Sequence, residues 1–252
     1  MTATANAILG AGSVRIDYYD PILLAFQGLG DPLGADKFEI SPDSENKQKI
    51  SKTKESYGQA VASVAYAKPT KIAIVLSSMS AQALAMQLQG TRSAWTQGSA
   101  TITDEAVVAK LDKWIKLSKR NISDVGLTVK HTSGTPTYVL GTDYLINYFT
   151  GEIKPLSTGV IAADESVKVS GAALAIAGDQ IAGGTQAQVR AHLTWEGLNL
   201  VDGQQIECEC WEAVLTSSKG FDFLANDFNG IELTGYLVVP AGKTEPYVVR
   251  LK

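Results

Sequence analysis

Few residues in this chain are able to carry catalytic chemistry. Its only histidines are His131 and His192. A hydrolase needs a nucleophile and a base that activates it, and histidine is the usual base. His131 adjoins a turn that contains glycine and proline, and His192 alternates with the apolar positions of an expected strand, so we expect both to be ordinary surface residues. No Gly-x-Ser-x-Gly or His-Glu-x-x-His motif is present, and the sequence therefore predicts that the protein is not an enzyme.

The spacing of the cysteines argues against a metal site. Cys208 and Cys210, with the two histidines, would make four ligands, but structural zinc sites use cysteines separated by two to four residues. Two cysteines at alternate positions of one strand face the same way and are poorly placed to bond each other. We expect reduced thiols in the core, and the sequence predicts no metal and no cofactor.

Two further patterns have a catalytic interpretation and a structural one. Glu207 and Glu209 lie on one face of an expected strand, and a glycosidase needs two carboxylates on one face to act on the same substrate. An exposed polar strand face explains the two glutamates equally well. The glycines between Gly28 and Gly34 resemble a phosphate-binding loop only in composition. The spacing of these glycines, Gly-x-Gly-x-x-x-Gly, does not match a phosphate-binding motif, Pro32 lies between them, and no helix pattern follows. We therefore expect an ordinary loop.

The elements that would position these residues are mainly strands. The stretch Tyr138–Val169 alternates with a period of two around the turn residues Thr150 and Gly151, and this predicts a β-meander. Later segments repeat the alternation between turns such as Asp202-Gly203. This strand spacing favours a mainly β fold, a β-sandwich or partly open barrel of two antiparallel sheets.

Helical spacing is convincing at one place. Ser80 is a suitable N-cap, Leu84 and Leu88 share one face, and Gly90 is placed to end the helix. The segment Asp104–Leu117 is compatible with a helix or with a loop or helical turn followed by a strand, and we favour the second.

Composition and charge restrict the function further. The 252 residues are 45% hydrophobic and 19% charged, enough for a sizeable core, and we expect one domain over residues 1–252. The net charge of −4 argues against a protein that reads nucleic-acid sequence, which would carry a basic face. We expect no secretory signal, because the first basic residue is Arg15 and no long apolar run precedes it, and no membrane span. The protein is therefore expected to be made in a cytoplasm.

Residues 42–58 form a polar stretch rich in Lys, Ser and Glu that cannot supply much core. On composition alone this stretch is expected to be a mobile surface loop. An extended loop or hairpin arm, with Gln59–Tyr66 as its returning strand, is the alternative, and the family resemblance described next favours it.

Two stretches together resemble a known family. The first is the meander described above, and the second runs from Trp211 through the acidic, aromatic loop Asn226–Gly230 into a last strand. Both are similar to the major tail tube proteins of long-tailed, siphovirus-like bacteriophages, and the resemblance covers most of the chain. It implies a structural virion protein that forms homohexameric rings, which stack into the tube that conducts double-stranded DNA into the host.

The resemblance also implies partners, a location and contact residues. The partners would be other copies of the chain, the tape measure protein, and the tail terminator and tail tip proteins, with DNA passing non-specifically and no membrane involved. The location would be the virion tail, assembled in the cytoplasm of the host bacterium. The lumen candidates are Glu207 and Glu209. The candidates for contacts between rings or subunits are Asp43, Glu45, Lys47, Lys49, Lys52, Lys54, Glu55, Asp227 and Phe228.

A different class of function stays open on the sequence alone. A secreted or surface β-sandwich that binds carbohydrate or acts as an adhesin would place exposed aromatic residues on a ligand platform. Tyr144, Tyr148 and Trp195 are the candidates for that platform.

Overall fold

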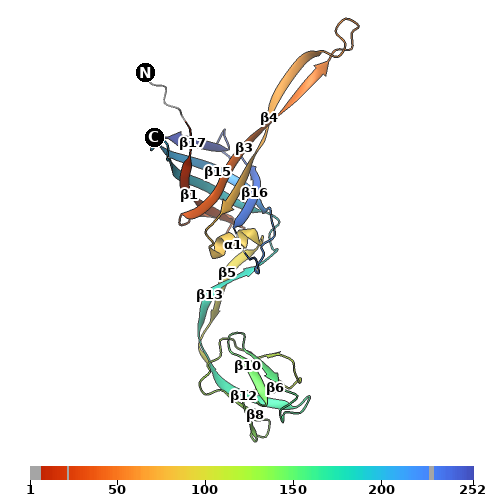
Figure 1. Cartoon of the computed structure of the whole chain (residues 1–252), viewed down its shortest axis with the longest axis vertical. Helices are drawn as coiled ribbons and strands as arrows, with labels where there is room; N and C mark the ends of the chain where they lie inside the picture. The colour runs from red at the N-terminus through yellow and green to blue at the C-terminus, as the bar shows by residue number, and fades with distance from the viewer. Residues whose placement is uncertain (1–6, 22, 227–229) are drawn as a thin grey trace. The chain divides into compact units, whose positions relative to one another are not determined.

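The computed structural model (Figure 1) describes residues 7–21, 23–226 and 230–252. Strands make up 56% of the chain, and the described residues contain one short helix, so the fold is mainly β as the sequence predicts. The structure has two compact units where the sequence suggests one domain. Unit 1 comprises Met1–Arg92 with Ile181–Lys252, and unit 2, Ser93–Gln180, is inserted between those segments. The physical reason is that the buried apolar side chains form two separate clusters, one in each unit.

Unit 1 is built on one large antiparallel sheet that curls into a partial ring. Its strands follow the order β14-β1-β3-β4-β16-β15-β17, and β14 also pairs with β15, which brings the path back to its start. Strand β2 pairs with β1 off this path. The strands are β1 (Gly10–Asp20), β2 (Ala25–Leu29), β3 (Leu33–Ile50), β4 (Ala60–Leu76), β14 (Val189–Asn199), β15 (Gln205–Ser217), β16 (Ile231–Leu237) and β17 (Tyr247–Leu251).

The core of unit 1 lies inside this ring. Alternate residues of the strands point inward, among them Ile16, Ile74 and Leu193, which are at most 2% exposed. Cys208 and Cys210 belong to the same cluster and are free thiols, which confirms their expected place in the core.

A β-bulge within β15 changes which alternate residues of the strand face the core. Ala191 pairs with Ala213 and Leu193 pairs with Cys210, so β15 carries one extra residue at this point. Simple alternation from Ile206 would place Val214 on the inner face with Cys208 and Cys210, but the extra residue prevents this. Beyond the bulge Ala213 and Leu215 are fully buried, and Val214 lies on the other face.

The helix α1 (Ala81–Gln87) confirms the sequence expectation and contacts β15 and β16. The Ser80 hydroxyl accepts a hydrogen bond from the Ala83 N–H at 3.0 Å, which caps the first turn. At the other end Gln89, with φ of 47°, takes the left-handed conformation. Gly90 serves close packing, because a Cβ there would lie 2.6 Å from the carbonyl oxygen of Ala182.

Unit 2 contains two small antiparallel sheets around a second core. One sheet has the strand order β6-β12-β8-β9, and the other has the order β10-β11-β7. Strands β5 and β13, through which the chain enters and leaves unit 2, pair with each other. The strands are β5 (Thr91–Gln97), β6 (Ala100–Val108), β7 (Ile115–Lys116), β8 (Thr128–His131), β9 (Thr137–Tyr138), β10 (Tyr144–Asn147), β11 (Glu152–Pro155), β12 (Ser166–Ala173) and β13 (Ile176–Ala182).

The expected meander is only partly present. β10 and β11 form the hairpin, with Ile146 opposite Ile153 and Gly151 in the turn at φ +67°. The following strand β12 does not return to β11 and pairs with β6 and β8. The connection 156–165 is longer than the roughly two to five residues of a hairpin loop, so it does not hold β12 beside β11.

The segment Asp104–Leu117 contains no helix. Residues up to Val108 belong to strand β6, and Ile115–Lys116 form β7. The strand at the end of this segment is therefore confirmed, whereas the expected loop or helical turn at its start is wrong. Pairing of Val107 with Val167 on β12 favours the strand, because it buries both side chains in the unit 2 core.

Candidate functional site

The polar stretch 42–58 belongs to a long hairpin, which we call the arm. Within it β3 and β4 stay paired from Asp43 opposite Lys68 to Ile50 opposite Ala60. In unit 1, β1 and β16 pair only with the proximal parts of these strands, so among the described residues the arm pairs only with itself (Figure 1). Residues 60–69 of β4 are all exposed, on both faces of the ribbon. The arm is thus a two-stranded ribbon that covers no core.

The two faces of the arm differ in chemistry. One face, which we call the charged face, carries Glu45 opposite Tyr66 and Lys47 opposite Val64. The Glu45 carboxylate pairs with Lys68 at 3.0 Å, and the Lys47 ammonium lies 5.4 Å from the centre of the Tyr66 ring. Hydrogen bonds from Tyr66 and Lys68 lower the pKa of Glu45. The opposite face carries small uncharged residues: Ser44, Asn46, Gln48, Ser63, Ala65 and Ala67.

The tip of the arm is ordered by a triangle of hydroxyl groups. The Ser51 Oγ lies 2.9 Å from Thr53 Oγ1 and 2.6 Å from Ser56 Oγ, and the last two atoms are 2.6 Å apart. The backbone N–H of Ser51 donates to the Gln59 carbonyl at 2.8 Å. Ser51 is consequently buried, whereas Tyr57 is 76% exposed. The predicted contact residues Lys52, Lys54 and Glu55 all lie on this tip and are exposed.

The remaining contact candidates lie along the arm or outside the described residues. Asp43 is at its base, where its carboxylate lies 3.8 Å from the Lys71 ammonium. Lys49 is exposed opposite Ala62. Asp227 and Phe228 fall in the segment that the structure does not describe.

The lumen candidates Glu207 and Glu209 are paired carboxylates on the outer face of β15. Arg250 of β17 binds both, at 3.1 Å and 2.8 Å. The hydrogen bond to Glu209, and to a smaller extent that to Glu207, raises the pKa of Arg250. On the same face Arg15 of β1 pairs with Glu196 of β14 at 2.8 Å. Two arginines facing three glutamates leave this patch with a net charge of −1, so it is nearly neutral.

His192 lies on this same outer face, with Nε2 3.6 Å from Glu209 Oε1 and its ring tilted toward Trp211. Because Cys208 and Cys210 point into the core, the strands of unit 1 do not bring His192 to the two sulfurs. Across the described residues no group of three or more His, Cys, Asp or Glu side chains is placed to hold a metal ion.

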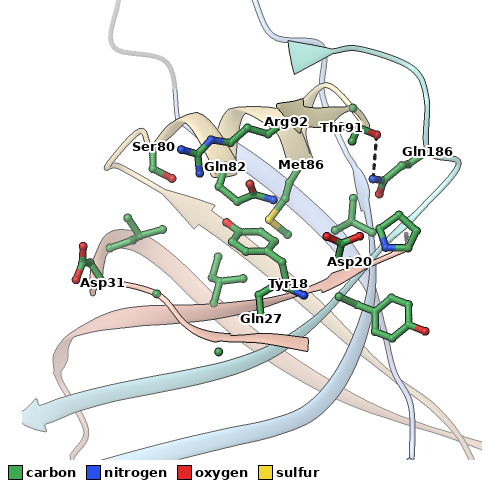
Figure 2. A pocket seen from close by; sticks show the side chains of 18 residues that line it. Tyr18, Asp20, Gln27, Asp31, Ser80, Gln82, Met86, Thr91, Arg92 and Gln186 are labelled. Atoms are coloured by element: carbon green, nitrogen blue, oxygen red, sulfur yellow. Dashed lines mark hydrogen bonds between the residues drawn. The ribbon is translucent and has the colours of Figure 1, made fainter. Parts of the chain in front are cut away.

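A cavity of about 470 Å³ opens in unit 1 between β1, the segment Gly28–Leu33 and the start of α1 (Figure 2). Figure 2 shows polar groups around it, including Tyr18, Asp20, Asp31 and Gln82. Burial raises the pKa of the Tyr18 phenol, although Arg92 opposes this effect. The rim is held by Asp17, whose carboxylate accepts hydrogen bonds from the N–H groups of Gln27 and Gly28.

The three aromatic residues predicted for the platform of a carbohydrate-binding or adhesin module are not all exposed. Tyr144 is 3% exposed and belongs to the core of unit 2. Tyr148 packs against the same core, while Trp195 belongs to unit 1 and stacks on Phe38 with ring centres 6.5 Å apart. Burial of Tyr144 removes the ring face that a sugar would need.

The structure places His131 in a side-chain cluster that the sequence analysis missed. Its Nδ1 lies 2.6 Å from Ser133 Oγ and accepts from the Ser133 N–H, and its Nε2 lies 3.8 Å from Glu165 Oε1. The Tyr138 hydroxyl donates to the same Glu165 oxygen. The Ser133 hydroxyl also donates to the carbonyl of Thr135 at 2.9 Å, so this serine is engaged within its own turn. The sequence signal for the contact between His131 and Ser133 was a serine two residues after a histidine in a turn. The contact with Glu165 could not be inferred, because Glu165 is more than thirty residues away in the chain.

Glu165 gives unit 2 an expected pH dependence. Burial acts to raise the pKa of Glu165, but hydrogen bonds from Tyr138 and the Ala162 N–H, with His131 nearby, outweigh it and lower that pKa. Tyr138 responds in the opposite direction: burial first, and then its bond to Glu165, raise its pKa to about 12. A lowered pKa in the folded state stabilises the fold above the ordinary value of 4.5, and this stabilisation is lost as the pH falls further.

We expect Glu165→Gln to lower the free energy of unfolding by about 1–2 kcal/mol at neutral pH. It should also flatten the dependence of stability on pH below about 4.5, as measured by urea unfolding of the full chain. The neighbouring Asp164 pairs with Lys110 at an exposed position, so Asp164→Asn is a matched control with an effect of about 0.5 kcal/mol or less. Equal acid sensitivity of the wild type and Glu165→Gln would contradict this assignment.

Comparison with known proteins gives one family. The family model described as Protein of unknown function UCP028589 matches residues 7–246, which include the arm, all of unit 2 and all of unit 1 except its two ends. No curated protein matches the chain. The described residues contain no helix with the length and apolarity needed to cross a membrane. Because the match extends over nearly all of the sequence, the chain belongs to the family described as Protein of unknown function UCP028589.

Proposed function

We propose that this protein is a structural subunit that assembles with copies of itself into hexameric rings, which stack as the tube of a phage tail. The observation that carries the proposal is the arm. Residues 43–50 and 60–68 form a ribbon with no other strand beside it and no core beneath it. A two-stranded hairpin in water is at best marginally stable, so a long one is maintained most readily where a partner covers it.

The sheet of unit 1 supports association as well. Strand β17 pairs only with β15, and β2 pairs only with β1, so each leaves an edge with unpaired backbone groups in the described part of the chain. Val249 and Leu251 of β17 are 50% and 60% exposed. Exposed edges promote pairing with other chains, and a closed ring of copies would pair them without leaving an open end.

The outer face around Arg250 is compatible with the passage of double-stranded DNA. A basic surface would bind the phosphates and retain the polymer, and a strongly acidic one would repel it. The arginine–glutamate pairs at Glu196, Glu207 and Glu209 bring this patch close to neutrality. In the proposed tail, the tape measure, terminator and tip proteins would be the other partners, and DNA would pass without specific contacts.

The proposal is tested by negative-stain electron microscopy and sedimentation velocity of the purified protein over a range of concentration and salt. Rings or tubes with a central hole wide enough for duplex DNA are the expected result. If the protein alone stays monomeric, tail tip components are added, since an initiator can be required. A monomer that still forms no rings or tubes with these components would overturn the proposal.

A further inference from the structure

Trp114, in unit 2, has a ring that no other ring or cation covers within the described parts of the chain. The other three tryptophans each contact another ring: Trp95 packs against Phe149, Trp195 against Phe38, and Trp211 against His192. Trp114 is 48% exposed. A bare indole ring offers a flat apolar surface that a ligand can cover.

The pairing of β7 with β11 directs Trp114 to the solvent side of a small sheet. Ile115 of β7 pairs with Ile153 of β11, and both pack in the core of unit 2. Successive residues of a strand point to opposite faces, so Trp114 and Lys116, the neighbours of Ile115, point away from this core. Both are exposed. Extending the register by one residue puts Trp114 beside Lys154 of β11.

Hydrogen-bonding groups of β10 and β11 share this side of the sheet. Glu152 lies between Lys116 and Asn147 in the strand register. Asn147 Oδ1 accepts from the Thr150 N–H at 3.2 Å, and Glu152 Oε2 accepts from the Thr150 hydroxyl at 2.9 Å. The Asn147 amide nitrogen and Glu152 Oε1 have no hydrogen-bond partner among the described residues, so one donor group and one acceptor remain for a ligand. We call this surface the Trp114 face; its residues are Trp114, Lys116, Asn147, Glu152 and Lys154.

Positive charge is concentrated around the Trp114 face. Residues 113–120, Lys-Trp-Ile-Lys-Leu-Ser-Lys-Arg, contain four basic and no acidic side chains. Lys154 adds one positive charge, and Asp112 and Glu152 subtract two, which leaves a net charge of +3. Unit 2 as a whole has eight Lys or Arg and nine Asp or Glu residues, a net charge of −1. The Trp114 face is therefore a basic surface on a slightly acidic unit, and it favours an anionic ligand.

Three lysines at this surface have no ion pair among the described residues. The described ion pairs of lysine in unit 2 are those of Lys110 with Asp164 and of Lys168 with Asp104. Lys113, Lys116 and Lys154 form none. An ammonium group without a carboxylate partner can bind an anionic group of a ligand and need not first break an internal pair.

An acidic glycan matches this combination better than a nucleic acid does. Single-stranded nucleic acids are held by several stacking rings along a basic groove. Here one free ring stands on a face that also carries Glu152, which repels a nearby phosphate. A sugar ring covers one indole, its hydroxyls exchange hydrogen bonds with Glu152 and Asn147, and its acidic group pairs with an ammonium group.

We propose that the Trp114 face binds an acidic glycan, with one sugar ring stacked on Trp114 and its anionic group held by Lys116 and Lys154. This site gives the protein a second function, attachment to an acidic polysaccharide. It does not rest on the proposed self-assembly, because all of its residues belong to unit 2.

Calorimetric titration of the full chain tests the site. The probes are oligogalacturonate, which carries a carboxylate on every sugar, its neutral methyl ester, and phosphorylated dextran. Trp114→Ala should weaken binding of the acidic probes about tenfold, whereas Trp114→Phe, which retains a ring, should stay within about threefold of wild type. Lys116→Gln with Lys154→Gln should also cost about tenfold, and the methyl ester should bind about tenfold more weakly than the acid. Binding should protect wild-type tryptophan fluorescence from quenching by iodide, and this protection should be lost in Trp114→Ala.

The matched control is Lys130→Gln with Lys168→Gln. These two lysines pair across β8 and β12 in the other sheet of unit 2, so the control removes the same two charges away from Trp114. It should change affinity by less than about twofold, because salt screens exposed charges at a distance. Circular dichroism and urea unfolding verify that every variant is folded.

Three results would overturn the site. The first is that wild type binds neither acidic probe at millimolar concentration. The second is that the control pair weakens binding as much as the change of Lys116 and Lys154 does, which would mean that attraction is not local. The third is that single-stranded DNA binds more tightly than the glycans and loses affinity with Trp114→Ala, which would make a nucleic acid the occupant. Each of them leaves the tube proposal standing, and a chain that binds the glycan but never forms rings keeps the site and loses the tube.

Discussion

Deleting the distal arm should separate folding from assembly. We expect a variant in which residues 44–67 are replaced by Asn-Gly, joining Asp43 to its strand partner Lys68, to fold and to lose stacking by at least about 100-fold, or about 3 kcal/mol of association free energy. Asn-Gly is the preferred sequence of a two-residue hairpin turn, so the shortened strands can close. The loss of stacking follows because the deleted ribbon carries every basic residue of the tip.

The fold should tolerate this deletion because the ribbon contributes nothing to the core. None of residues 44–67 belongs to the buried apolar cluster of unit 1. Shortening a hairpin changes loop-closure entropy only slightly, and we expect the free energy of unfolding to stay within about 1 kcal/mol of wild type. Urea unfolding gives this quantity, and electron microscopy gives the assembly state.

A suitable control retains the length of the arm and removes only its charges. Replacing Lys47, Lys49, Lys52 and Lys54 by Gln preserves the ribbon and should weaken stacking less than the deletion does. Normal tubes formed by the deletion variant would show that the arm has no role in assembly. That result would remove the main support for the proposed function.

The largest expected effect on stability is at Leu215, in the part of β15 that follows the bulge. Leu215 is fully buried in the core of unit 1, and Leu→Ala at such sites removes favourable transfer energy and leaves a cavity. We expect Leu215→Ala to lower the free energy of unfolding by about 3–5 kcal/mol. Chemical denaturation of the full chain, monitored by tryptophan fluorescence, measures the change.

Val214 is the matched control for Leu215. It is the adjacent residue, it is apolar, and simple alternation from Ile206 would place it in the core. The bulge turns it to the opposite face, where it is only half-buried, so Val214→Ala should cost about 1 kcal/mol or less. A larger effect at Val214 than at Leu215 would mean that β15 has no bulge and keeps one phase throughout.

The two units have different relations to the proposed function. Unit 1 contains the ring of strands, the arm, the cavity and the near-neutral patch around Arg250. Unit 2 contributes none of these features and has a separate core, beside which Tyr138 hydrogen-bonds to Glu165. Variants in unit 2 are therefore suited to serve as controls for assembly, and variants in unit 1 as its tests.

Local features of the chain were determined by the sequence itself. The alternation of apolar residues specified strands, Ser80 specified the start of α1, and the turn residues Thr150 and Gly151 specified the β10–β11 hairpin. The burial of Cys208 also followed from its position in an alternating strand. These features depend on residues only a few positions apart, whose spacing is visible in the chain.

The tertiary structure alone decided which strands meet. The alternation of residues along β12 predicts that Val167 and Val169 share a face. It does not predict that β12 lies between β6 and β8. The bulge in β15 is likewise set by its pairing with β14, because an extra residue is visible only against a partner strand.

The candidate sites depend on the same long-range pairings. Arg250 pairs with Glu207 and Glu209 because β17 lies beside β15, about forty residues away in the chain. Glu165 meets His131 and Tyr138 only when unit 2 has folded. The sequence therefore determined many of the strands, though not β6 at Asp104–Val108, and it determined which residues are charged. The fold decided which charges are compensated, because burial and strand neighbours are properties of the assembled sheet and not of any one segment.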